Sequence, residues 1–222
     1  MLSCRQVSKT YVTERGNVAA VGGIDLDVEA GRFAAIIGRS GSGKSSLMAM
    51  IGGLSRPTAG QVIVDGTDIW TLSENALAAF RNGRIGYVFQ FASLLQTLRL
   101  IDNVALPAML GRREAASEIY ARASGLLGQM GLSGYLDAYP SEISAGEQRR
   151  AVIARALIND PAVLLADEPT SDLDEQTEIE IMDELLAVNR ERGTMLILVT
   201  HNLSLAEQAE QIVHIANGAI VA

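Results

Sequence analysis

The sequence predicts an α/β fold, in which a buried sheet is covered by helices. Hydrophobic residues make up 48% of the 222 residues and aromatic residues only 5%, so the interior is aliphatic, as in buried parallel sheets. A buried strand is predicted at Phe33–Ile37, and it runs through a glycine-rich loop into an apolar helical stretch at 47–54. Strands at 162–166 and 195–200 flank a predicted helix, Glu175–Arg192, which makes a βαβ crossover.

The predicted crossover helix is amphipathic, and two short strands follow it near 212–215 and 219–221. Four apolar side chains of the helix share one face, which we expect to be buried: Ile179, Met182, Leu185 and Leu186. No internal repeat or low-complexity tract divides the sequence, so we interpret residues 1–222 as a single domain.

Two lobes are predicted to be attached to the core. Residues 1–35 and 60–72 are rich in Val and Thr and in turn signals, which is typical of an antiparallel β lobe. Within it, strands at 61–65 and 68–70 are joined by an Asp-Gly turn, a common hairpin signal. Residues 91–155 carry Leu, Ala and Met at helical spacing, interrupted by proline and glycine, which predicts an inserted helical lobe.

The charge balance argues against a nucleic-acid partner. The chain has 26 acidic and 18 basic residues, a formal net charge of -8, and no run of Lys or Arg that could follow a phosphate backbone. Cys4 is the single cysteine, which excludes an internal disulfide and a multi-cysteine metal site. We expect Cys4 to be a small buried side chain, in a protein of a reducing compartment such as the cytosol.

No segment is predicted to enter a membrane. The sequence does not open with a charged and then apolar leader, and its longest apolar runs are far shorter than a membrane span. Any membrane role is therefore expected to depend on a partner protein.

The glycine-rich loop after the first buried strand matches the phosphate-loop pattern G-x-x-x-x-G-K-[ST]. Its residues, with the one that follows, are Gly38, Arg39, Ser40, Gly41, Ser42, Gly43, Lys44, Ser45 and Ser46. Glycines allow backbone N–H groups to surround phosphate oxygens at a helix N-terminus. We expect Lys44 to reach the β- and γ-phosphates of ATP and Ser45 to give a hydroxyl ligand to Mg²⁺. The pattern predicts a P-loop NTPase.

Two carboxylates, Asp167 and Glu168, follow the buried strand at 162–166. Ligands of open α/β sheets bind at this carboxyl edge of the strands, where the phosphate loop also lies. Asp167 is expected to help hold Mg²⁺, and Glu168 to accept a proton from the water that attacks the γ-phosphorus. The alternative is a solvated acidic turn that caps the next helix.

Residues 143–157, which begin Ile-Ser-Ala-Gly-Glu-Gln-Arg-Arg, resemble the signature sequence of ATP-binding-cassette (ABC) proteins. Other motifs of that family have matches in the family order: Tyr11 resembles its adenine-stacking residue, Gln90 its loop glutamine, 171–174 its D-loop and His201 its switch histidine. The resemblance extends over the whole chain. It implies a RecA-like core and ATPase activity.

The resemblance also assigns roles. Gln90 would link Mg²⁺ to a moving lobe, and His201 would hydrogen-bond to the γ-phosphate. Tyr11 could instead cover a strand pair, Gln90 could be a surface residue and His201 could cap a helix, whereas we interpret Asn202 as an N-cap. In a second subunit the signature would contact the nucleotide, through these residues: Ser144, Ala145, Gly146 and Glu147.

The chain departs from the family pattern at two positions. Ala145 stands where glycine is usual, and its methyl group would cost about 1 kcal/mol if the backbone needed a positive φ. We predict that the change is tolerated, because Ser144 and Gly146 remain. Ser46 stands where threonine is usual, and we consider this neutral because Ser45 carries the metal-facing hydroxyl.

The resemblance implies two kinds of partner. A second copy, head to tail, would bury two ATP molecules in the interface, and membrane permease subunits would be driven from the cytoplasmic side of the inner membrane. The apolar stretch 91–110 suits a groove for a short partner helix, although part of it must belong to the core. This stretch resembles the lipoprotein-releasing, macrolide-export and cell-division ATPases, which favours export or extraction of a lipoprotein, peptide or drug.

Other functions remain open at this stage. One is a soluble ABC-type ATPase that acts on nucleic acid or ribosomes, although such proteins usually carry a coiled-coil insertion or a second cassette, and this chain has neither. Others are a nucleotide-sensing or cell-division regulator with little turnover. A regulator with little ATP turnover is disfavoured, because the chain retains Lys44, Glu168 and His201.

Overall fold

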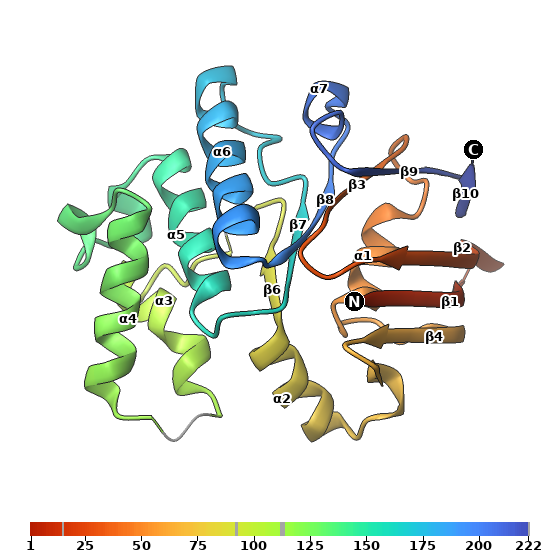
Figure 1. Ribbon diagram of the computed structural model, residues 1–222, viewed down its shortest axis with the longest axis horizontal. Coiled ribbons are helices and arrows are strands. Elements are labelled where there is room, and N and C mark those ends of the chain that lie inside the picture. The colour runs from red at the N-terminus through yellow and green to blue at the C-terminus, as the bar shows by residue number, and fades with distance from the viewer. Residues whose placement is uncertain (15, 92, 112–113, 222) are drawn as a thin grey trace.

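The computed structural model describes residues 1–14, 16–91, 93–111 and 114–221. Two sheets lie side by side, with most of the helices on the far side of the larger sheet from the smaller one (Figure 1). The smaller sheet is antiparallel, in the order β2-β1-β4-β5, and the larger has the order β10-β9-β3-β8-β7-β6. All of its pairs are parallel except β10 with β9. The α/β fold class is therefore confirmed.

The strands are β1 (Leu2–Thr13), β2 (Gly16–Val28), β3 (Phe33–Ile37), β4 (Ala59–Val64), β5 (Thr67–Asp68), β6 (Ile85–Val88), β7 (Val163–Asp167), β8 (Met195–Val199), β9 (Gln211–Ala216) and β10 (Ala219–Val221). The helices are α1 (Lys44–Ile51), α2 (Glu74–Arg84), α3 (Leu100–Met109), α4 (Ala116–Gln129), α5 (Ala145–Leu157), α6 (Glu175–Arg192) and α7 (Leu203–Ala206). Short 3-10 turns lie at Ile69–Thr71, Ser133–Tyr135 and Pro140–Glu142. None of the helices that the structure describes is long and apolar enough to cross a membrane.

The parallel sheet separates two hydrophobic clusters. Side chains of β8 alternate between them: Leu196 and Leu198 join the cluster of α3, α4, α5 and α6, while Ile197 and Val199 join that of α1 and the antiparallel sheet. This alternation follows from the two-residue repeat of a strand. The sheet therefore places α1 and α5 on opposite faces.

Three sequence expectations need correction. A strand was expected at 68–70, but Asp68 accepts a hydrogen bond from the backbone N–H of Trp70 at 3.1 Å and caps a 3-10 turn. The helix expected at 47–54 is α1, which begins at Lys44 and ends before Gly52. Ile179 is 48% exposed, because the buried stripe of α6 passes through Ile181 and its neighbours instead.

Candidate nucleotide site

The phosphate loop lies between β3 and α1 and is closed around its lysine. The ammonium of Lys44 donates to the carbonyl oxygens of Gly38 at 2.8 Å and Arg39 at 3.1 Å, and the residue is only 6% exposed. The N–H of Ser42 donates to the same Arg39 oxygen. The hydroxyl of Ser42 is buried and finds no hydrogen-bond partner among the described residues. A buried donor of this kind suits an oxygen ligand such as phosphate.

Two loop glycines are required by contacts with other segments. A Cβ on Gly38 would lie 2.1 Å from the carbonyl oxygen of Ile215 on β9. Gly43 has φ 108°, and a Cβ there would lie 2.3 Å from the carbonyl oxygen of Ala20 on β2. The N–H of Gly218 also donates to the Ser42 carbonyl at 2.9 Å. The loop is therefore held by both sheets.

The carboxylate of Asp167 ends β7 beside the loop. Burial raises its pKa, and so does the nearby charge of Glu168, while a hydrogen bond from Ser45 and the charge of Lys44 lower it. Its Oδ1 atom is buried and unpaired within the described part of the chain. Asp167 and Ser45 thus bring two oxygen donors together, the ligand type that Mg²⁺ prefers.

Glu168 and His201 are brought into direct contact. The Oε2 atom of Glu168 lies 2.6 Å from Nδ1 of His201, which follows β8. Glu168 has φ 47°, a left-handed conformation that is uncommon for a residue other than glycine, and its N–H donates to Val199 at 2.9 Å. The glutamate is largely shielded, whereas 68% of the histidine side chain is exposed. A carboxylate and an imidazole at this distance form a pair suited to proton transfer.

Gln90 is exposed, and its backbone carbonyl accepts a hydrogen bond from Arg149, which the sequence did not indicate as a functional residue. The guanidinium of Arg149, on α5, donates to the carbonyl oxygens of Phe89 and Gln90, both at 2.6 Å. Arg149 is only 3% exposed, and burial lowers its pKa. It lies within the signature segment, but nothing in the sequence indicates that its partners are carbonyls at the end of β6.

Tyr11 approaches the loop from the antiparallel sheet. Its hydroxyl lies 3.4 Å from the hydroxyl of Ser46, in the first turn of α1, and the Lys9 ammonium lies 5.1 Å from the centre of its ring. Tyr11 is 39% exposed, so part of its side chain is accessible to a ligand. The structure therefore brings Tyr11 to the phosphate loop.

The signature residues form the start of α5, on the other face of the sheet from α1. Ser144 is the N-cap: its hydroxyl accepts from the Glu147 N–H at 3.3 Å, and the Glu147 carboxylate accepts from the Ser144 N–H at 2.8 Å. Ala145 is the first residue of the helix and has no positive φ, so its methyl group causes no backbone strain. The exposed N-terminus of α5 is separated from the phosphate loop of its own chain.

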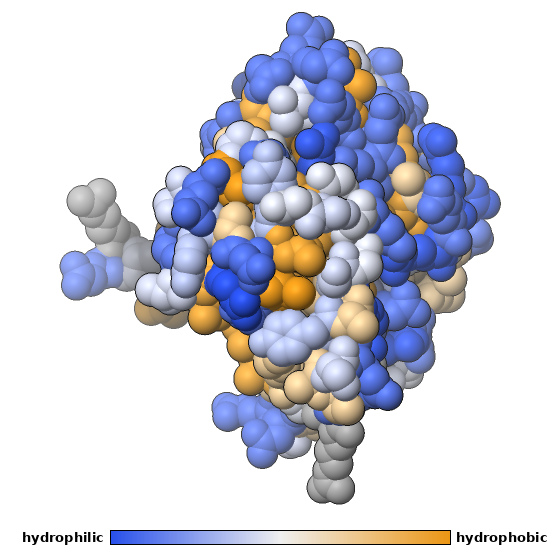
Figure 2. Space-filling view, turned by 90° about the vertical axis from the view of Figure 1, so that its left-hand side faces the viewer, coloured by the Kyte–Doolittle hydropathy of each residue, from blue (hydrophilic) through white to orange (hydrophobic). Residues whose placement is uncertain are grey.

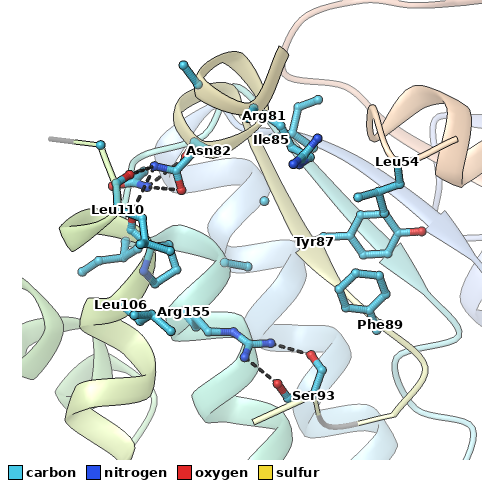
Figure 3. Close-up of a pocket in the computed structure, with 18 of the residues that line it drawn as sticks. Leu54, Arg81, Asn82, Ile85, Tyr87, Phe89, Ser93, Leu106, Leu110 and Arg155 are labelled. Atoms are coloured by element: carbon cyan, nitrogen blue, oxygen red, sulfur yellow. Dashed lines mark hydrogen bonds between the residues drawn. The ribbon is translucent and has the colours of Figure 1, made fainter. Parts of the chain in front are cut away.

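A separate groove of about 750 Å³ opens between α2, β6, α3 and α5. Figure 3 shows Leu54, Tyr87 and Phe89 on one side of it and Leu106 and Leu110 on the other, with Arg155 bound to Ser93. Figure 2 shows hydrophobic atoms gathered on the helical side of the molecule and largely surrounded by hydrophilic ones. The stretch 91–110 is divided: one part lines the groove, another is buried in the core, and Ala92 lies outside the described residues.

Comparison with known proteins decides the family. A family model described as ABC transporter matches residues 21–171, more than half of the sequence. The chain belongs to the ABC transporter family. It is an ATP-binding ABC ATPase with the P-loop NTPase fold, as the sequence motifs predicted.

Relatives of this ABC ATPase are named for export or release. The lipoprotein-releasing system ATP-binding protein LolD of Syntrophus aciditrophicus is 41% identical over all of the chain and 99% of its own length. The macrolide export ATP-binding/permease protein MacB of Syntrophobacter fumaroxidans is 42% identical over 99% of the chain, which spans 31% of that protein. Neither name points to nucleic acid or ribosomes.

Solved structures of another ABC cassette are closely similar. The dimeric structure of MJ0796, a bacterial ABC transporter cassette, has a TM-score of 0.93 and 35% identity, and the match covers 100% of this chain and 97% of that one. A second dimeric structure of MJ0796, in a post-hydrolysis state bound to ADP and Pi, matches with the same TM-score, identity and coverage. The fold is therefore that of an ABC ATPase cassette.

Proposed function

We propose that this ABC ATPase hydrolyses ATP in a site shared by two copies and thereby drives a membrane-embedded complex for export or extraction. The observation that carries the proposal is the contact between Glu168 and His201, beside the phosphate loop that surrounds Lys44. A carboxylate and an imidazole at 2.6 Å, next to a phosphate-binding ammonium, suit attack of water on a γ-phosphate.

Each polar group near the loop has one proposed task. Lys44 would turn from the Gly38 and Arg39 carbonyls to the β- and γ-phosphates, and backbone N–H groups of the loop would bind the same oxygens. Glu168 would accept the proton of the attacking water, and His201 would hydrogen-bond to the γ-phosphate. Tyr11 would stack on adenine from the side of the antiparallel sheet.

The residues present fit a magnesium ion that arrives with the nucleotide. The unpaired Oδ1 of Asp167 and the hydroxyl of Ser45 are hard oxygen donors at one place, and Gln90 would add an amide oxygen. The described residues contain no cluster of three or more His, Cys, Asp or Glu side chains that could hold a metal alone, so phosphate oxygens would complete the set. The ion would supply charge that stabilises the transferring phosphoryl group.

A second copy would complete the site. The α5 N-terminus, with Ser144, Ala145, Gly146 and Glu147, lies on the other face of the sheet from the phosphate loop of the same chain. Two copies arranged head to tail would bring each signature to the other's ATP. The dimeric state of the structurally similar cassette MJ0796 supports this arrangement.

We propose that the groove between α2 and α3 binds a short helix of a membrane subunit, at the cytoplasmic face of the inner membrane. The lining is apolar on both sides, through Tyr87, Phe89, Leu106 and Leu110, and its volume of about 750 Å³ suits the side chains on one face of a short helix. The names of the LolD and MacB relatives support a lipoprotein, peptide or drug as the transported molecule.

The main test is Glu168→Gln. ATP binding should persist while hydrolysis slows by about 10² to 10⁴-fold, because the proton acceptor is lost. Solution scattering should show dimers of this variant when ATP and Mg²⁺ are added. Glu191→Gln, at the exposed end of α6, is the matched control and should behave as the wild type. Normal turnover in Glu168→Gln would remove Glu168 from the mechanism, and monomers alone would refute the shared site.

A second experiment tests the groove. Leu110→Glu introduces a charge at an exposed apolar position of the groove wall, so it should abolish co-purification with the membrane subunit while leaving the ATPase activity of the isolated chain unchanged. Leu203→Glu changes an equally exposed leucine outside the groove and should retain co-purification. Equal recovery of both variants with the membrane subunit would refute the groove as the docking site.

A further inference from the structure

Glu178, in the first turns of α6, belongs to none of the sequence motifs, yet it joins the two loops that carry the proposed catalytic pair. Its Oε1 atom accepts a hydrogen bond from the Thr170 hydroxyl at 2.7 Å, and its Oε2 atom accepts one from the Asn202 side-chain amide at 3.1 Å. Thr170 follows Glu168 by two residues, and Asn202 directly follows His201. One carboxylate thus links the loop after β7 to the loop after β8.

The link matters because Glu168 is held in an unfavourable backbone conformation. A residue other than glycine at φ 47° is strained and persists only where its surroundings fix it. On one side, the Glu168 N–H is bound to Val199. On the other, Thr170 is buried and its hydroxyl is bound to Glu178. Release of that hydroxyl would allow the loop to relax and the Glu168 carboxylate to move.

The orientation of Asn202 is fixed as well. Its Oδ1 atom accepts from the Ser204 N–H at 3.0 Å and caps α7, and its own N–H donates to the Thr200 hydroxyl at 3.0 Å. The side-chain amide NH₂ is therefore directed away from α7, toward Glu178. This side chain is next to His201, whose exposed ring is held by its contact with Glu168.

We propose that Glu178 is a positioning residue, which keeps Glu168 and His201 together for ATP hydrolysis. The inference rests on the proposed function, since it assumes that this pair is catalytic. Glu178 is not expected to touch the nucleotide, because both oxygens of its carboxylate face the protein groups described above. Its loss should therefore lower kcat without weakening ATP binding.

The test compares three variants of the full chain by steady-state ATPase assay. Glu178→Met keeps the length of the side chain but accepts no hydrogen bonds, and kcat should fall by about tenfold or more with KM for ATP unchanged within about twofold. Glu178→Gln can accept from Asn202 and donate to the Thr170 oxygen, so its kcat should stay within about threefold of wild type. Glu191→Met, at the exposed end of the same helix, should equal the wild type.

A double-mutant cycle separates positioning from general destabilisation. In a His201→Ala background, Glu178→Met should cause less than its full single-variant loss, because the two changes disrupt one unit. Independent, multiplying losses would overturn the proposal. So would wild-type kcat in Glu178→Met, or a loss explained entirely by a lower folded fraction in thermal unfolding. If the wild type lacks ATPase activity, or Glu168→Gln retains it, the proposed function itself fails.

Discussion

The guanidinium of Arg149 binds the chain at the end of β6, and its replacement by methionine gives the sharpest test of how the helical lobe is joined to the parallel sheet. In Arg149→Met, the carbonyl oxygens of Phe89 and Gln90 both lose a charge-assisted hydrogen bond of 2.6 Å. An unpaired carbonyl costs about 1–3 kcal/mol when it is buried, and less here, because Phe89 is half-buried and Gln90 is exposed. Part of this is offset, because the variant no longer buries a guanidinium that is only 3% exposed.

The expected net loss is about 2 kcal/mol of unfolding free energy, which lowers Tm by roughly 4–8 °C in a chain of this length. Thermal unfolding of the nucleotide-free protein, followed by circular dichroism, measures it. Arg149→Lys should give an intermediate Tm, since one ammonium cannot hold both carbonyls in the same geometry. Arg190→Met, at the exposed end of α6, is the control and should change Tm little. An unchanged or higher Tm in Arg149→Met would show that desolvation outweighs the two bonds and would refute the reasoning.

Two further predictions concern the site itself. Burial raises the pKa of Asp167 in the folded chain above its value in the unfolded chain. The free energy of unfolding therefore falls as pH rises from the ordinary carboxyl pKa to this raised pKa, and it stays lower at neutral pH. Asp167→Asn should therefore raise the Tm of the nucleotide-free protein at neutral pH while greatly reducing Mg²⁺-dependent ATPase activity; a lower Tm would contradict this. Ala145→Gly should change ATPase activity by less than about tenfold, because Ala145 is already helical. A larger gain in the same assay would show that its methyl group hinders the proposed shared site.

Some elements could be predicted because local chemistry determines them. Helix α6 begins and ends where the sequence indicates: Asp174 accepts a hydrogen bond from the Thr177 N–H at 3.0 Å as the N-cap, and Gly193 ends the helix with φ 63°. Strand β3 is an uninterrupted apolar run before the phosphate loop. Asp68 shows the limit, because its side chain turns the chain into a 3-10 helix where β-forming residues favoured a strand.

The residues of the candidate site likewise fall into those that the sequence indicated and those that it did not. The phosphate-loop pattern indicated Lys44, the position after a buried strand indicated Glu168, and the family resemblance indicated His201. The fold brings the last two into contact. The sequence did not indicate Arg149, because its partners are distant backbone carbonyls, which every residue has. Nor did it indicate Glu178, because its partner Asn202 lies in another loop, 24 residues away. Such contacts depend on the arrangement of β6, β7 and β8 against α5 and α6, and no local pattern contains that information.

Contacts with both sheets hold the phosphate loop in place, and this affects how much of the free energy of ATP binding is spent on ordering the loop. Ala20 and Ile215 lie against the loop glycines, and Gly218 is bonded to Ser42, so contacts within the protein hold the loop. A loop that is already ordered loses little conformational entropy when it takes up phosphate. In the proposed dimer, more of the free energy of ATP binding would then remain for the association of the two copies.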